Sequence, residues 1–93
     1  MHFEWDEEKN KINLIKHGIW FEEVQSVFQD PNAMVFLDEI NSICEERFII
    51  IGNNAFGINL IVVHCYCKDD DIIRIISARK TTKKERLIYE ERV

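Results

Sequence analysis

The chain has 93 residues, of which 46% are hydrophobic and 31% charged, with a single proline. This length predicts one globular domain over residues 1–93, because chains below about 100 residues seldom divide into separate domains. A core this small leaves little room for a large cofactor pocket, so no cofactor is expected. The formal net charge of −5 argues against a nucleic-acid binder that relies on overall positive charge.

The composition also excludes membrane and exported proteins. The longest apolar run, Ile58 to Cys67, is far shorter than the ~20 residues of a membrane span. The N-terminus is acidic and polar, unlike a signal peptide, so a cytoplasmic location without a membrane partner is expected. The cysteines are odd in number and are expected to be free thiols rather than disulfides: Cys44, Cys65 and Cys67.

Charge is distributed unevenly along the chain. Residues 1–50 have a balance of −7, whereas residues 51–93 have a balance of +2, and the positive charge gathers from Arg74 onward. A local basic surface can bind phosphate even on an acidic protein, because salt screens surface fields beyond about 8 Å. Nucleic acid therefore remains a possible ligand of the second half of the chain.

The first third of the sequence predicts two helices. Asp6 is a good N-cap and Gly18 a helix stop, which together predict a helix over about residues 6–17. Apolar residues at helical spacing from Phe21 to Phe28 predict a second helix, which must end before Pro31.

The remainder predicts four strands and a third helix. Four segments are rich in β-branched and aromatic residues: 33–37, 47–52, 58–67 and 72–79. The connections between them are too short for a crossover helix, so an antiparallel meander is expected. Residues 82–85, Thr-Lys-Lys-Glu, match a capping box that opens a helix to about Glu91. The predicted fold is α+β, with the order ααββββα and a four-stranded sheet.

The start of the last predicted helix is unusually basic. Lys83 and Lys84 lie in its first turn, where the helix dipole is already positive, and Arg79 and Lys80 precede the cap. An anion bound there would relieve the repulsion, as at many phosphate sites. A solvated basic turn explains the same pattern, and the sequence leaves both interpretations open.

Arg74 interrupts an otherwise apolar strand. Strict alternation places it on the same face as Ala78, with Ser77 and Arg79 on the other face. Such an arginine needs a partner, which is either a substrate phosphate or, as is more usual, an acidic side chain. The candidate acids are Asp38, Glu45 and Glu46.

Two histidines carry possible chemistry. His17 ends the first predicted helix, where the dipole favours its cationic form, so it is either a capping residue or a general acid. Alternation places His64 and Tyr66 on one face of a strand and Cys65 and Cys67 on the other. This arrangement lacks the ligands of a tetrahedral site, so core packing is expected and no metal.

Several short motifs, in this order and spacing, connect the chain to a known family: Phe3-Glu4-Trp5-Asp6, Lys16-His17-Gly18, Asp30-Pro31, Glu45-Glu46-Arg47-Phe48, Arg74-Ile75-Ile76-Ser77-Ala78-Arg79-Lys80 and Glu85-Arg86. Through these motifs nearly the whole chain resembles the BrnT family of toxins. The resemblance implies a RelE-like fold and a ribonuclease toxin of a type II toxin–antitoxin system that inhibits translation. It also implies a hetero-complex with a BrnA-like ribbon-helix-helix antitoxin, through which operator DNA is bound and the operon repressed.

Metal-free RNA cleavage would proceed by attack of the ribose 2′-OH on the adjacent phosphate, leaving a cyclic phosphate and a 5′-OH. This route needs a base, an acid and cations at the phosphate. Residue chemistry and the resemblance together assign Arg74 and Arg79 to the phosphate, His17 as acid or base, Lys16 as added charge and Glu46 as a weaker candidate base. The expected RNA contacts are Lys80, Lys83, Lys84 and Tyr89.

A second hypothesis assigns no strong catalysis to the chain. The acidic first half and the run Asp69-Asp70-Asp71 are unfavourable for RNA. The alternative is therefore a catalytically weak interaction module that acts only as antitoxin partner and co-repressor.

Overall fold

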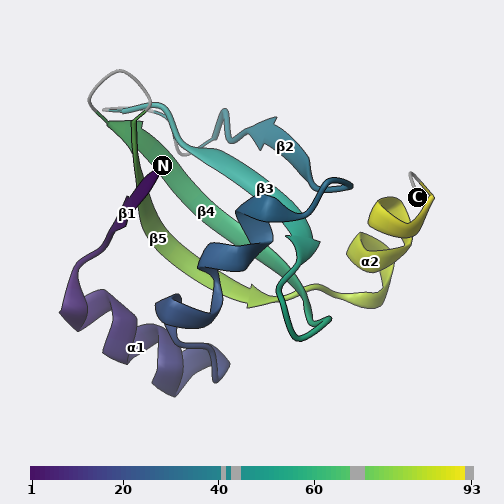
Figure 1. The fold of residues 1–93 in the computed structure, drawn as a ribbon, viewed down its shortest axis with the longest axis horizontal. Helices are drawn as coiled ribbons and strands as arrows, with labels where there is room; N and C mark the ends of the chain where they lie inside the picture. Colours follow the sequence, from purple (N-terminus) through teal and green to yellow (C-terminus); the bar gives the residue numbers. More distant parts are fainter. Residues whose placement is uncertain (41, 43–44, 68–70, 92–93) are drawn as a thin grey trace.

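The computed structural model of the chain describes residues 1–40, 42, 45–67 and 71–91, so Cys44 and Arg92 lie outside it. Figure 1 shows a twisted sheet with helical segments beside it. The elements are β1 (His2–Glu4), α1 (Glu7–His17), the 3-10 helices η1 (Phe21–Glu23) and η2 (Gln25–Gln29), β2 (Met34–Leu37), β3 (Phe48–Asn53), β4 (Asn59–Cys67), β5 (Ile72–Lys80) and α2 (Lys83–Glu90).

The sheet has the strand order β1-β5-β4-β3-β2. Strands β2 to β5 form the predicted antiparallel meander, but β1 joins the far edge of β5 in parallel, pairing Glu4 with Arg74. The expected four-stranded, wholly antiparallel sheet is therefore wrong, because the described sheet is five-stranded and mixed. A strand of three residues is too short to show an alternating pattern, and its partner lies 70 positions later.

The prediction of a second α-helix is also wrong. The segment forms two short 3-10 helices, η1 and η2, rather than one α-helix. Its apolar residues Phe21, Val24 and Val27 are spaced three apart, which matches the three residues per turn of a 3-10 helix. All three side chains are fully buried.

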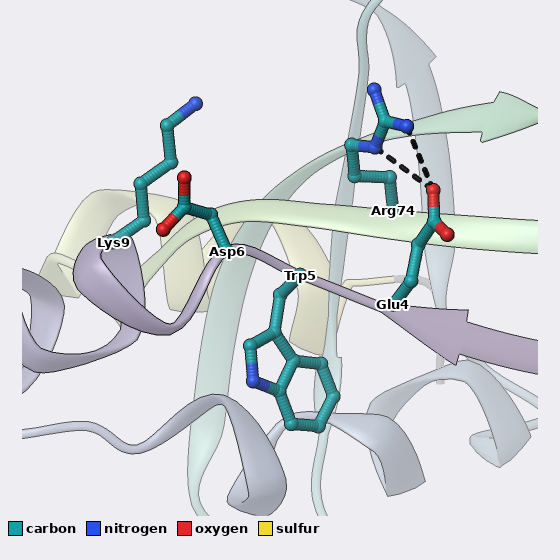
Figure 2. Close-up of a pocket in the computed structure, with 5 residues that line it drawn as sticks. All are labelled: Glu4, Trp5, Asp6, Lys9 and Arg74. Carbon is teal, nitrogen blue, oxygen red and sulfur yellow. Dashed lines mark hydrogen bonds and ion pairs between the residues drawn. The ribbon is translucent and has the colours of Figure 1, made fainter.

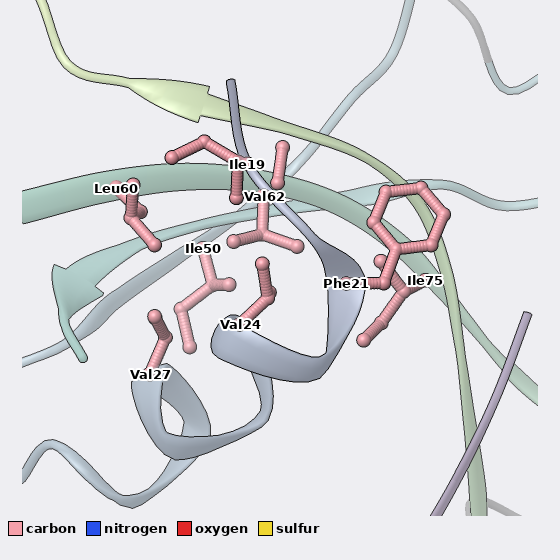
Figure 3. Close-up of a cluster of buried hydrophobic side chains, with 9 residues drawn as sticks. Ile19, Phe21, Val24, Val27, Ile50, Leu60, Val62 and Ile75 are labelled. Carbon is pink, nitrogen blue, oxygen red and sulfur yellow. The ribbon is translucent and has the colours of Figure 1, made fainter. Parts of the chain in front are cut away.

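The core lies on one face of the sheet, beneath this 3-10 segment (Figure 3). It joins side chains from before and within η1 and η2 to side chains from β3, β4 and β5. The buried cluster consists of Ile19, Phe21, Val24, Val27, Ile50, Leu60, Val62, Ile75 and Ala78. The opposite face of the sheet is thus left for other contacts.

Helix α1 docks through polar rather than apolar side chains. Asp6 caps its start by accepting from the N–H of Glu8 at 2.8 Å, and Gly18 ends it in the left-handed conformation, as predicted. Its buried residues are Asn10 and Asn13, whereas Ile12 and Ile15 are 58% and 85% exposed. The helix is therefore held in place mainly by hydrogen bonds.

Asn13 takes the place of a strand neighbour along the edge of β5. Its Nδ2 donates to the carbonyl of Ala78 at 2.8 Å and to that of Ile19 at 3.0 Å. Its Oδ1 accepts from the N–H of Ala78 at 3.0 Å. Because β1 pairs only as far as Arg74, this amide satisfies backbone groups of β5 beyond the last residue of β1.

Asp30 joins the end of η2 to β3 and α2. Its Oδ1 accepts from the N–H of Asn32 at 2.9 Å, and its Oδ2 accepts from the N–H of Asn53 at 2.7 Å and the hydroxyl of Tyr89 at 2.6 Å. Partial burial acts to raise the pKa of Asp30, but these hydrogen bonds lower it overall. Gly52 allows this contact, since a Cβ there would lie 3.1 Å from Oδ2.

His64 packs inside an aromatic cluster, as the sequence predicts. Its ring centroid lies 4.9 Å from that of Phe28, 5.2 Å from Tyr66 and 6.1 Å from Phe48. Burial lowers the pKa of His64 to about 4, so the ring is neutral at physiological pH.

None of the described helices is long and apolar enough to cross a membrane.

Asn13→Ala is expected to lower the free energy of unfolding by about 3 kcal/mol, because it leaves buried backbone groups of Ala78 and Ile19 without partners. Urea denaturation measures the loss. Lys11→Ala, an exposed change on the same helix, is the matched control and should stay within about 0.5 kcal/mol of the parent. Equal stability of the two variants would contradict the role given to Asn13.

Acid is expected to destabilise the fold through His64. Below pH 6.5 the unfolded chain binds a proton that the folded chain excludes until about pH 4, so stability falls across this window. The difference corresponds to about 3 kcal/mol. Urea denaturation at several pH values measures the free energy of unfolding across this window. In His64→Phe the free energy should not show this decrease, whereas in His2→Ala, which changes an exposed histidine, it should. Parallel pH profiles of His64→Phe and the parent would disprove the assignment.

Candidate functional site

A β-bulge in β5 decides which side chains face the open side of the sheet. Val63 pairs with Ser77, but the next residue of β4, His64, pairs with Ile75, so Ile76 is the extra residue. A bulge leaves one residue unpaired and shifts the alternation of the strand beyond it.

The shift changes the prediction for Arg74. Ile75 and Ala78 both point into the core, so Arg74, Ser77 and Arg79 share the opposite face. The expectation that Arg74 and Ala78 share one face, opposite Arg79, is therefore wrong. Strict alternation failed because the sequence carries no clear mark of the bulge.

A hollow of about 310 Å³ lies on this open face. Its apolar lining comes from neighbouring strands and its polar lining from a helix end, a loop and β5. The lining residues are His17, Asp38, Ile49, Ile61, Val63, Ser77, Ala78 and Arg79. We refer to this hollow as the site pocket. It brings together two of the five predicted catalytic residues, His17 and Arg79.

His17 reaches the site pocket because α1 ends beside β5. It is the last residue of α1, one turn beyond Asn13, whose amide fixes the helix on Ala78. A second hollow of about 230 Å³ adjoins the site pocket and shares His17 and Ser77 with it. Lys16 lines this second hollow together with His17.

Arg79 is held by a carboxylate of the following helix. Its Nη1 and Nη2 donate to the two oxygens of Glu85 at 2.8 and 2.9 Å, and Nη1 also donates to the carbonyl of Lys80 at 3.3 Å. Glu85 accepts from the N–H of Thr82 as well, completing the predicted capping box. The hydrogen bonds from Arg79 lower the pKa of Glu85 to about 2. The anion favoured at this basic helix start is therefore an internal one.

The four predicted RNA-contact residues lie in two different environments, three of them exposed and one buried. Lys80, Lys83 and Lys84 are exposed around the start of α2. Tyr89 is buried, and its hydroxyl donates to Asp30 at 2.6 Å. Burial and this contact raise the pKa of Tyr89 to about 12, so the hydroxyl remains a donor that anchors α2.

Arg74 and Glu46 lie outside the site pocket. Arg74 pairs with Glu4 of β1, its Nη2 and Nε lying 2.8 and 3.0 Å from Oε1 (Figure 2). Its partner is thus none of the expected acids, because β1 was not foreseen. Glu46 lines a separate hollow of about 410 Å³ that it shares with Phe48 and Tyr66.

Sequence reasoning missed Asp38 and Ser77 as residues of the site pocket. Asp38 follows β2, in which Met34 and Phe36 pair with Ile51 and Ile49 of the open face. Alternation along β2 and its continuation would have placed Asp38 on this face too. That Ser77 lines the site pocket could be predicted only by knowing that the strand contains a bulge.

Comparison with known proteins identifies the family. Residues 5–85 match the family described as ribonuclease toxin, BrnT, of type II toxin–antitoxin system. The chain belongs to the BrnT family. The crystal structure of the Brucella abortus ribonuclease toxin BrnT is similar, with a TM-score of 0.69 and 25% sequence identity, over 89% of this chain and 99% of that chain. No match was found among curated proteins.

Membership of the BrnT family confirms the resemblance in the sequence. It makes this chain a member of a ribonuclease toxin family whose type II systems pair the toxin with an antitoxin. Its α+β fold is BrnT-like.

The contact between Arg79 and Glu85 is expected to lose its contribution to stability as pH falls from 4.5 toward 2. The folded-state pKa of Glu85, about 2, lies below its usual value of 4.5, so its contribution is complete above pH 4.5 and is lost as pH falls toward 2. The stability difference between the parent and Glu85→Gln should therefore shrink over this window in urea denaturation. Glu90→Gln, at an exposed position on the same helix, should show no such trend. A constant difference for Glu85→Gln would refute the assignment.

Proposed function

We propose that this chain is a metal-independent endoribonuclease toxin that cleaves RNA in the site pocket and so inhibits translation. The observation that carries the proposal is that His17 and Arg79 line one pocket although 61 residues separate them in sequence. RNA cleavage by 2′-OH attack requires proton transfer and positive charge at the phosphate, and these two residues supply one group able to transfer a proton and one cation.

Arg79 binds the phosphate in this proposal. Its contacts with Glu85 and Lys80 use three of the five N–H donors of the guanidinium, and they fix its orientation. The donors that remain, on Nε and Nη2, are the ones we assign to a phosphate oxygen. Charge that is already oriented before the reaction stabilises a transition state most effectively.

His17 transfers the proton. From the C-terminal end of α1 it donates a proton to the leaving 5′ oxygen, and Lys16 beside it adds positive charge. As the 2′ oxygen bonds to phosphorus, its proton passes to solvent water and the bond to the 5′ oxygen breaks, so the products are a cyclic phosphate and a 5′-OH. Lys80, Lys83 and Lys84 contact the RNA backbone around the start of α2. Support from the shared pocket does not extend to Glu46 or Tyr89.

The partner is a BrnA-like ribbon-helix-helix antitoxin, and the hetero-complex binds operator DNA through it. This part of the proposal rests on family membership. The protein itself carries a formal net charge of −5, which disfavours direct binding to duplex DNA.

The experiment is cleavage of total RNA by the purified protein in the presence of EDTA. His17→Ala and Arg79→Ala are each expected to reduce the rate by about 100-fold or more. His2→Ala and Arg86→Ala change an exposed histidine and an exposed arginine, and serve as matched controls. Undiminished cleavage by His17→Ala and Arg79→Ala would refute the site, and loss of cleavage with EDTA would refute the metal-free route.

One observation favours the second candidate, an interaction module with weak catalysis. The edge strand β2 exposes three consecutive apolar side chains, Val35, Phe36 and Leu37. Exposed apolar edges are typical places for a partner chain to bind. An interaction module predicts that the purified chain binds the antitoxin tightly but that expression of the chain alone does not arrest growth. A ribonuclease toxin predicts that expression of the chain alone does arrest growth.

A further inference from the structure

The site pocket is one of three hollows that share lining residues. A hollow of about 360 Å³ at the start of α1 is lined by Glu4, Trp5, Asp6, Lys9 and Arg74. It shares Lys9 with the hollow between α1 and β5, which in turn shares His17 and Ser77 with the site pocket. The three hollows are thus linked through shared residues from β1 along α1 to the open face of the sheet, and we refer to them together as the groove.

Four cations lie along this groove on a protein of net charge −5. They are Arg74 and Lys9 at the β1 end, Lys16 in the middle and Arg79 in the site pocket. Lys9 and Lys16 are seven residues apart on one helix, about 10 Å along its axis. The acids that line the same groove are Glu4, Asp6 and Asp38.

At the β1 end, the cations point away from the core. In Figure 2, the side chains of Lys9 and Arg74 rise on one side of the β1–α1 connection and Trp5 points to the other. Trp5 packs against Phe21, with ring centroids 6.1 Å apart. The charged ends of Lys9 and Arg74 thus lie on the same side of the connection, that of Arg74 in contact with Glu4, while Trp5 packs against Phe21 on the other side.

We propose that this groove is a track for single-stranded RNA, in which Lys9 and Arg74 form a distal subsite for backbone phosphates. The proposal rests on the proposed function, because the track leads to His17 and Arg79. Phosphate contacts outside the cleavage position fix the register of a strand without reading its sequence. A single strand fits this use, since its nucleotides can unstack and present the 2′-OH to the adjacent phosphate.

Glu4 competes with phosphate for Arg74 in the distal subsite. Its Oε1 holds Nη2 and Nε of Arg74, so a phosphate must share or displace this contact. Removing the charge of Glu4 and removing that of Arg74 therefore have opposite effects on RNA binding. If the pair served only to join β1 to β5, the two changes would act in the same direction.

The experiment compares kcat/KM for an RNA octanucleotide and a dinucleotide. The ratio of the two is expected to fall about fivefold in Lys9→Ala and in Arg74→Gln, and to rise in Glu4→Gln. Lys11→Ala, on the same helix but outside the groove, should keep the parent ratio. Each lost phosphate contact should also reduce the slope of log affinity against log salt by about 0.7.

A second measurement separates this inference from the proposed function. Binding of a 2′-O-methyl octanucleotide, which cannot be cleaved, is followed by fluorescence anisotropy in the same variants. If the parent cleaves neither substrate, the proposed function fails, while weaker binding in Lys9→Ala and tighter binding in Glu4→Gln still support the track. Equal binding by the parent, Lys9→Ala and Arg74→Gln, or a common direction for Glu4→Gln and Arg74→Gln, would overturn it.

Discussion

The hydrogen bonds between the amide of Asn13 and the backbone of Ala78 position the candidate site. Strand β1 is too short to cover the whole edge of β5, and Asn13 satisfies the N–H and the carbonyl of Ala78 beyond it. Asn10, Asn13 and His17 follow one another at helical spacing, so the side of α1 that docks on the sheet also presents His17. One polar contact thereby serves both the fold and the chemistry.

The β-bulge at Ile76 supplies the other half of the site. Without this extra residue, Arg74 and Arg79 would lie on opposite faces of β5. With it, Ser77 and Arg79 join the open face beside the end of α1, and Arg74 lies on the same face farther along the strand. A single inserted residue thus places Arg74 and Arg79 on the same face of β5.

Much of the local structure could be predicted from the sequence. The caps at Asp6 and Gly18 and the capping box that ends at Glu85 depend on neighbouring residues, and the structure confirms them. Features that depend on distant residues were missed, namely the pairing of β1 with β5 and the acid that pairs with Arg74. The pocket shared by His17 and Arg79 also needs tertiary structure, because the sequence offers residue chemistry but no distances.

Gly52 shows how a residue without a side chain can affect the charge in the site. A Cβ at this position would lie 3.1 Å from Oδ2 of Asp30, which would have to move by a few tenths of an ångström. The same oxygen holds Tyr89 and thus α2, the helix that carries Glu85 to Arg79. A larger residue at position 52 is therefore expected to shift Glu85 relative to Arg79 and so to change the charge around the site pocket, although Gly52 does not line the pocket.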